Sequence, residues 1–200
     1  MAERNLPAFP AAPRGAPGKK TLAGVIGTLA GAVLLFTVVP REESGRTVKA
    51  TAEASGDVHT RHVAGKQYLR AYKDIVGVVT ICDGDTHDVR MGQTATEAEC
   101  DARLERQLIA HAEPLIRCAR PLYGKPNQVA ASVSLAYNIG PAGFCRGSVA
   151  RKINAGDWSG ASAAFLLYNR AGGRVNRGLD GRRHREQALF DTDRPPQGAR

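Results

Sequence analysis

Residues 68–86 read YLRAYKDIVGVVTICDGDT, and two kinds of local pattern meet in this stretch. Residues 77–82 are rich in valine, threonine and isoleucine, which favour β-strands. The acidic, glycine-containing run at 83–86 that follows is typical of a tight turn. We therefore expect residues 76–90 to form a β-hairpin around that turn.

Beyond the hairpin, apolar residues recur with a helical period. Thr96 and Glu99 have the spacing of a capping box at a helix start. A stripe with intervals of three and four then continues to about Ile116, through Leu104, Leu108, Ala112 and Leu115. This pattern predicts a long amphipathic helix.

The remaining sequence also favours helices. Pro126 can open one whose residues VAASVSLAY (129–137) are apolar or small on all sides, which is typical of a buried helix. Gly140 and Pro141 end it. Shorter helices are expected at 58–70, 147–154, 158–169 and 178–190. The predicted fold class is α+β, with a small β-hairpin lobe and a mainly helical lobe.

Several motifs together resemble the phage-type lysozymes, glycoside hydrolase family 24. The family pattern has Glu-Gly, then an apolar residue and AYxD, then GxxTIGYGHT, and residues 68–86 are similar to its later part. Four more stretches match in family order: TATEAEC (94–100), AYNIG (136–140), INAGDW (153–158) and YNRAGGRVNRGLDGRR (168–183). The resemblance covers about residues 60–190. It implies a lysozyme-like fold and hydrolysis of the β-1,4 bond between N-acetylmuramic acid and N-acetylglucosamine in peptidoglycan.

The resemblance also implies catalytic roles for Asp74 and Thr80. In the family, a Glu is the acid, an Asp nine residues later handles water, and a Thr six residues after the Asp helps to position that water. Asp74 and Thr80 have this six-residue spacing. Glycoside hydrolysis needs such a second carboxylate beside the proton donor. From its position alone, Asp74 could instead be a turn residue that closes the hairpin.

The position of the expected acid holds a glycine. Nine residues before Asp74 lies Gly65, and no carboxylate occurs between Asp57 and Asp74. If this segment is helical, His62 lies one turn earlier on the same face and could serve as the acid; a surface or capping role is the alternative. Glu53 would need the preceding linker to fold over the site.

Two functions from different classes follow. The first is a peptidoglycan-degrading endolysin, a muramidase that causes cytolysis of a bacterial host during phage release. The second is a catalytically impaired lysozyme-fold protein that binds peptidoglycan or acts as a scaffold, because the expected Glu is Gly65.

A second departure lies in the turn, where Asp85 replaces the family's His. Asp83, Asp85 and Asp88 gather around Gly84, but their spacing does not fit an EF-hand, which needs a Glu at position twelve. We interpret the cluster as an acidic turn and expect no metal and no cofactor.

The run TLAGVIGTLAGAVLLFTVV (21–39) carries no charge and ends at Pro40 and Arg41. At about 1.5 Å per residue, a helix of this length nearly spans the ~30 Å bilayer core. The basic flank before it predicts a cytoplasmic N-terminus. We prefer an uncleaved signal anchor to a cleaved signal peptide, because the run exceeds a typical signal-peptide core. Its many small residues would hold it only weakly, which favours later release.

These features predict five segments. They are a flexible cytoplasmic arm at 1–20, a transmembrane signal anchor at 21–40, a linker at 41–57, a lysozyme-like domain at 58–192 and a disordered tail at 193–200. The predicted location is the bacterial inner membrane, with the domain in the periplasm, anchored or released.

Four cysteines fit an exported domain. Cys82, Cys100, Cys118 and Cys145 are widely spaced and form no CxxC pair, which argues against a zinc site. Three disulfide connectivities are open, and free buried thiols are a further alternative. We favour Cys82–Cys100 and Cys118–Cys145, because these pairs close the shorter loops.

The composition limits the partners. With 28 Lys and Arg against 19 Asp and Glu, the formal net charge is +9. The only dense basic stretch, 174–185, is not interleaved with aromatic residues, so nucleic acid is a poor match. The expected partners are peptidoglycan and, through residues 21–39, the cytoplasmic membrane; the soluble domain is expected to be a monomer.

Overall fold

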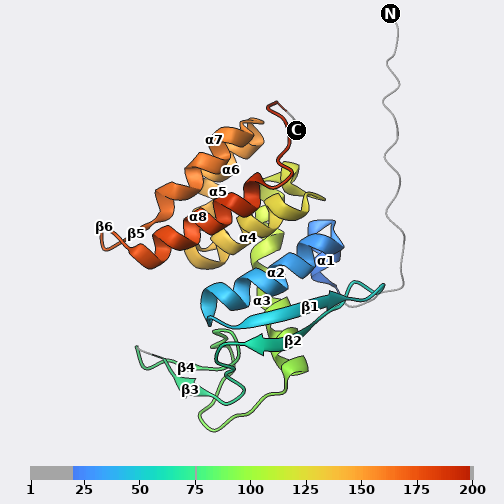
Figure 1. Ribbon diagram of the computed structural model, residues 1–200, viewed down its shortest axis with the longest axis vertical. Coiled ribbons are helices and arrows are strands. Elements are labelled where there is room, and N and C mark those ends of the chain that lie inside the picture. Colours follow the sequence, from blue (N-terminus) through green and yellow to red (C-terminus); the bar gives the residue numbers. More distant parts are fainter. Residues whose placement is uncertain (1–19, 75, 199–200) are drawn as a thin grey trace, which may run out of the picture.

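The computed structural model describes residues 20–74 and 76–198, in which a mainly helical body carries three two-stranded sheets (Figure 1). The N-terminal half contains α1 (Leu22–Ile26), α2 (Leu29–Glu43), β1 (Thr47–Ala52), β2 (Val58–Ala64), β3 (Tyr72–Lys73), β4 (Val79–Thr80) and α3 (Glu97–Cys118). The C-terminal half contains η1 (Arg120–Leu122), α4 (Pro126–Ile139), α5 (Pro141–Arg146), α6 (Ser148–Asn154), α7 (Trp158–Ala164), η2 (Phe165–Tyr168), β5 (Arg170–Ala171), β6 (Arg174–Val175) and α8 (Arg177–Asp191).

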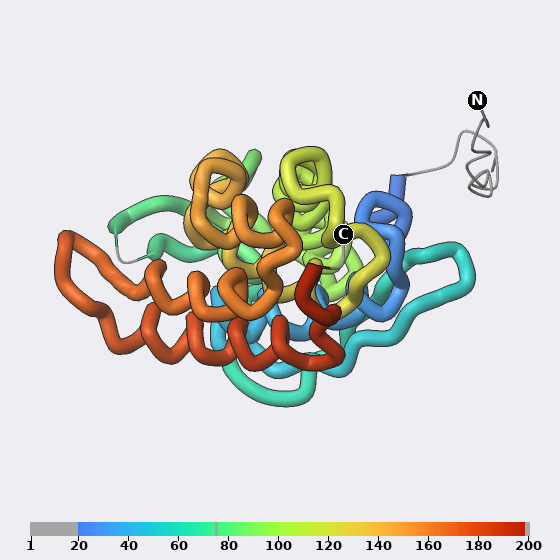
Figure 2. The backbone as a smooth tube through the Cα atoms, turned by 90° about the horizontal axis from the view of Figure 1, so that it is seen from above, coloured from blue at the N-terminus to red at the C-terminus, as the bar shows by residue number. Residues whose placement is uncertain are grey.

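The helical lobe follows the sequence pattern closely. Thr96 caps α3 with both bonds of a capping box, and Pro126 opens α4, as predicted. Helix α4 is buried on most of its surface and packs against α2, α3 and α8. The tips of the β5–β6 and β1–β2 hairpins project from opposite ends of the molecule (Figure 2). The predicted α+β fold class, with small β-hairpins and a mainly helical lobe, is therefore confirmed.

The segment expected to be one transmembrane helix forms two helices inside this fold. Gly27, with φ +75°, ends α1, and Thr28 caps α2. The positive φ and the closeness of the Tyr123 ring to a Cβ at position 27 both favour glycine at this break. The apolar side chains of residues 21–39 that are buried in the common core are Leu22, Ile26, Ala32, Leu35, Phe36 and Val39. Among the described residues, no helix has the length and apolar character needed to cross a bilayer.

The structure also differs from the expected linker and domain start. Helix α2 continues to Glu43, and β1 and β2 form a hairpin across residues 47–64. Val48, Val58 and Thr60 point inward while their neighbours along the strands are exposed. This alternation is a β pattern, which also explains why the helix expected at 58–70 is absent. The folded unit thus includes residues well before Val58.

Two further expectations need correction. The hairpin expected at 76–90 instead pairs β3 with β4, so Tyr72 lies opposite Thr80; the 83–86 run forms the separate tight turn, in which Ile81 and Asp85 exchange backbone hydrogen bonds. The tail expected to be disordered packs on the body through residue 198, whose amide donates to the carbonyl of Gly156. Most of the predicted arm, residues 1–19, and the last two residues lie outside the described part.

Both favoured disulfides are confirmed. Cys82 is bonded to Cys100, and Cys118 to Cys145. The first joins the loop after β4 to the start of α3, and the second joins the end of α3 to α5.

Candidate active site

The β3–β4 hairpin holds Asp74 and Thr80 in fixed positions. Asp74 Oδ1 accepts hydrogen bonds from the amides of Val76 (3.0 Å) and Val78 (2.8 Å). Thr80 is buried, and its hydroxyl donates to the carbonyl of Val78 at 3.1 Å. Asp74 is therefore a turn residue as well as the proposed catalytic carboxylate, and its Oδ2 makes no hydrogen bond to the described residues.

A second carboxylate, which the sequence analysis missed, lies at the end of α2. Glu43 is the last residue of that helix, and its side chain remains 24% exposed. Its Oε1 lies 2.8 Å from Arg182 Nη1. Arg182 is itself fixed by Glu186 (3.0 Å) and by the carbonyl of Ser134 (3.0 Å).

The neighbouring Glu42 is engaged differently. Both of its oxygens accept from Arg185, each at 2.7 Å, and its side chain is only 5% exposed. Of the two carboxylates, Glu43 is the one with an accessible side chain.

Arg182 shows the electrostatic balance at this helix end. Burial opposes its charge, but the negative charges of Glu43 and Glu186 outweigh burial, so the pKa of Arg182 is raised. Arg182 therefore remains a cation beside Glu43 and holds it in place.

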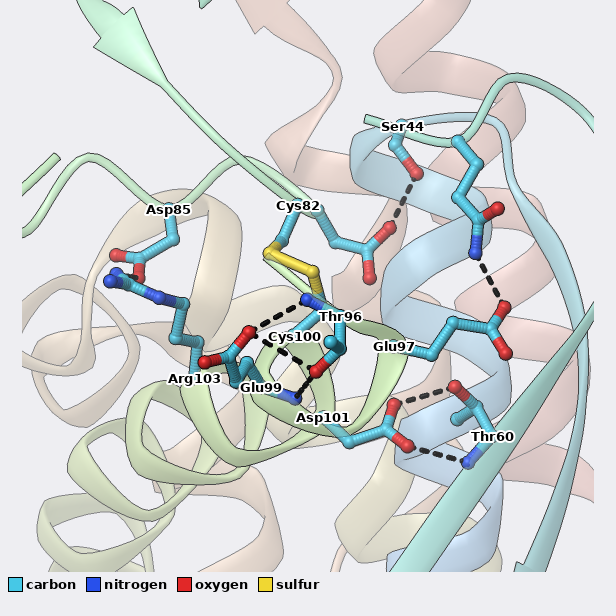
Figure 3. The surroundings of a disulfide bond; sticks show 12 residues. Ser44, Thr60, Cys82, Asp85, Thr96, Glu97, Glu99, Cys100, Asp101 and Arg103 are labelled. Carbon is cyan, nitrogen blue, oxygen red and sulfur yellow. Dashed lines mark hydrogen bonds and ion pairs between the residues drawn. A yellow bond between two sulfur atoms is a disulfide. The ribbon is translucent and has the colours of Figure 1, made fainter. Parts of the chain in front are cut away.

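The end of α2 bonds directly to the loop that follows Thr80. The hydroxyl of Ser44 donates to Asp83 Oδ1 at 2.8 Å. Arg46 Nε and Nη2 donate to the two oxygens of the same carboxylate, at 3.0 and 2.6 Å. Figure 3 shows Ser44 on one side of the disulfide at Cys82 and the Asp85–Arg103 pair on the other.

Burial and nearby acidic side chains raise the pKa of two tyrosines. Burial, followed by the charges of Glu43, Asp85 and Asp83, raises the pKa of Tyr137. Burial also raises the pKa of Tyr72, together with the nearby Tyr68, Asp74 and Asp83. The charge of Asp83 contributes to both shifts.

Gly65, where the sequence spacing predicts the acid, lies at the base of the β1–β2 hairpin. Its φ is +86°, and a Cβ there would come within 2.5 Å of the carbonyl oxygen of Gly45. Residues 45–65, which we call the β1–β2 excursion, therefore begin and end at the same place, where Gly45 and Gly65 are in close contact. Glu43 lies two residues before Gly45, at the start of this excursion. It precedes Asp74 by 31 residues, because the excursion is inserted between them.

The other candidate acids are placed elsewhere. His62 lies in strand β2, so the helical argument for it no longer holds, and its amide donates to Glu97. Glu53 lies at the far end of the hairpin and pairs with His59 at 3.2 Å.

The acidic turn is held by protein side chains. Asp85 Oδ2 lies 2.6 Å from Arg103 Nη1, and its Oδ1 accepts from the amide of His87. In the part of the chain that the structure describes, no group of three or more His, Cys, Asp or Glu side chains could hold a metal ion.

Comparison with known proteins identifies the class. The family described as phage lysozyme matches residues 64–186. The SAR-endolysin of Enterobacteria phage P21 is 39% identical over 129 residues, which are 62% of this chain and 75% of that protein. The SAR-endolysin of Bacteriophage PS34 is 33% identical over 157 residues, 76% of this chain and 91% of that protein.

Solved structures agree. A P22 lysozyme mutant is 34% identical with a TM-score of 0.56, covering 62% of this chain and 87% of its own. The active form of P1 phage endolysin Lyz has a TM-score of 0.61 at 21% identity and covers 86% of this chain and 91% of its own, which shows a shared fold. The chain therefore belongs to the phage lysozyme family. It is a glycoside hydrolase, an endolysin that degrades peptidoglycan.

One signal could have revealed Glu43 earlier. The family's Glu-Gly pair has a counterpart in Glu43-Ser44-Gly45, followed by two segments that alternate with period two. The family match begins at residue 64, the last residue of β2, and so omits this glutamate.

Proposed function

We propose that Glu43 is the general acid of this enzyme and that Asp74 and Thr80 act on the water. The bond cleaved is the β-1,4 link between N-acetylmuramic acid and N-acetylglucosamine. The observation that carries the proposal is the exposed Glu43 carboxylate, bound to Arg182 at the end of α2 and adjoining the Thr80 loop through Ser44.

The chemistry divides between the two carboxylates. Glu43 would protonate the glycosidic oxygen as the leaving sugar departs, and Asp74 would bear the negative charge that the oxocarbenium-like transition state requires. Asp74 is suited to this because two backbone amides bind one oxygen and fix the other's direction. Thr80 would help to orient the attacking water, and Asp74 would accept the proton that this water loses as its oxygen bonds to the sugar carbon.

Glu43 also bears on the alternative of a catalytically impaired binding protein. That alternative depended on the absence of a carboxylate at position 65. Because Gly65 returns beside Gly45, the excursion moves the acid to an earlier sequence position without removing it from the fold. The structure therefore favours the hydrolase.

We further propose that residues 21–39 are a membrane anchor before the enzyme acts and become α1 and α2 after release into the periplasm. Support comes from the uncharged run and from the SAR-endolysin relatives. Leu22, Ile26 and Phe36 cannot be in lipid and in the core together. In the anchored state α2 is therefore absent from the core, and Glu43 is not positioned in the site. We also expect the released domain to be a monomer.

Product analysis of purified full-length protein on peptidoglycan tests the proposed reaction. New reducing ends at N-acetylmuramic acid, identified by mass spectrometry, are the expected result. Asp74→Asn should lower the rate by about 100-fold or more, because it removes the transition-state charge. Reducing ends at N-acetylglucosamine, or full activity of Asp74→Asn, would contradict the proposal.

A further inference from the structure

We propose that Asp83 is a positioning residue that fixes the acid Glu43 relative to Thr80, through its bonds to Ser44 and Arg46. This inference rests on the proposed role of Glu43. It assigns to one buried carboxylate the task of joining the two halves of the catalytic site.

Three hydrogen bonds from the segment after α2 converge on the Asp83 carboxylate. Arg46 and Asp83 form a two-bond pair whose side chains are only 3% and 4% exposed. Ser44 adds a third hydrogen bond, and it directly follows Glu43. Asp83 lies three residues after Thr80, beyond Ile81 and the disulfide-bonded Cys82. A planar guanidinium that binds both carboxylate oxygens fixes direction as well as distance.

The path of the backbone shows why a side-chain connection is needed between the end of α2 and β4. Between Glu43 and Asp74 the backbone passes through the whole β1–β2 hairpin. That hairpin is tied to α3, since the amide and hydroxyl of Thr60 donate to Asp101 at 2.7 and 2.5 Å. Covalent connection therefore does not fix the end of α2 against β4.

The other side-chain bonds of the loop after β4 connect it to α3 and not to α2. Cys82 is bonded to Cys100, and Asp85 to Arg103, both on α3. Asp83 is the residue of this loop whose bonds reach the helix end that carries Glu43.

The sequence also supports a positioning role for Asp83. In the pattern TIGYGHT, position 83 is a tyrosine, and here it is an aspartate. Its partner Arg46 is the first residue after Gly45, where the excursion begins. The charged residue at 83 and the excursion that supplies its partner therefore form one structural unit.

The test measures kcat and KM on a soluble glycan fragment of peptidoglycan, with thermal melting followed by circular dichroism. Asp83→Asn should lower kcat by about tenfold or more, while KM changes by less than about twofold, because misplacing a catalytic group slows the chemical step. Ser44→Ala keeps the Arg46–Asp83 pair and should lower kcat by about threefold. The matched control is Arg103→Gln, which breaks the loop's tie to α3; we expect a lower melting temperature with kcat within about twofold.

Each outcome decides one point. A wild-type kcat in folded Asp83→Asn would overturn the positioning role, and if that variant does not fold, a wild-type kcat in Ser44→Ala does so. An equal loss of kcat in Arg103→Gln would also overturn it, since any break in the loop would then suffice. Glu43→Gln, measured alongside, separates the two ideas: its full activity would refute the acid itself.

Discussion

Gly65 and Gly45 lie backbone against backbone at the two ends of the β1–β2 excursion, with only 2.5 Å between a Cβ built on Gly65 and the carbonyl oxygen of Gly45. This approach explains how an acid 31 residues before Asp74 can occupy a site where the family spacing is nine. It also excludes side chains at position 65.

Restoring a glutamate at the expected sequence position should therefore not restore a catalytic acid. Gly65→Glu combines a positive φ with a backbone clash, and we expect destabilisation of about 1–3 kcal/mol and no gain in activity. Urea denaturation and peptidoglycan clearing measure the two effects.

Gly92 provides the matched control for this substitution. Its φ is +88°, but nothing lies within 4 Å of a Cβ there. Comparing Gly65→Ala with Gly92→Ala separates the clash from the cost of the backbone angle. Equal losses of stability would refute the close approach.

Cys82 has an unusual backbone conformation beside the site. Its φ is +56°, and the family pattern has glycine at this position. Without the disulfide to Cys100, we expect Cys82→Gly/Cys100→Ala to be more stable than Cys82→Ser/Cys100→Ala by about 1 kcal/mol, because glycine adopts positive φ readily. Denaturant midpoints measure this difference, and a more stable serine variant would contradict it.

Asp157 gives a pH dependence with a defined sign. Its carboxylate binds Lys152, the amide of Gly160 at the start of α7, and Gln197, which together lower its pKa from 3.8 to about 2. A lowered pKa in the folded state stabilises the protein above about pH 4, and this contribution disappears as the pH falls from 4 to 2.

Asp157→Asn should therefore lower the melting temperature at pH 6 and have a smaller effect at pH 2.5. Melting curves of both proteins at the two values measure the difference. An effect that is unchanged or larger at the lower pH would contradict the assignment.

Helix α2 offers a pair of leucines that separates the membrane state from the folded state. Leu29 is 41% exposed in the fold, whereas Leu35 is fully buried. A lysine near the centre of a membrane helix costs about 2.5–3.5 kcal/mol. Leu29→Lys should therefore leave the membrane fraction but keep lytic activity, whereas Leu35→Lys should lose both membrane association and folding.

Membrane fractionation and clearing assays distinguish these outcomes. Leu29→Lys that remained in the membrane fraction would contradict the anchor proposal. Retained activity of Leu35→Lys would contradict the role of α2 in the core.

The sequence predicts some elements of this fold well and others poorly, for identifiable reasons. Helices α3 and α4 were predicted because Thr96, Pro126 and the apolar period mark them locally. The run at 21–39 is ambiguous, because the same apolar residues suit both a bilayer and a protein core. The β1–β2 hairpin was missed because its small polar residues conceal the inward alternation of Val48 and Val58.

Recognition of the site was limited by distance along the chain. Asp74 and Thr80 lie in one short hairpin, so their spacing survives intact. Glu43 is separated from them by an inserted hairpin. The return of the chain at Gly65 and the bonds of Asp83 to Ser44 and Arg46 bring these segments together. The local sequence offers only an indirect sign of that return, the Glu43-Ser44-Gly45 counterpart of the family's Glu-Gly pair.

A comparison of the activities of Glu43→Gln and Glu42→Gln decides whether Glu43 is the catalytic acid. Both substitutions remove one carboxylate at the end of α2, but only Glu43 has an accessible side chain beside the Thr80 loop. With purified folded proteins on peptidoglycan, we predict that Glu43→Gln loses at least about 100-fold in rate, while Glu42→Gln retains most of the wild-type rate. A Glu43→Gln variant that clears peptidoglycan as fast as Glu42→Gln would show that Glu43 is not the acid.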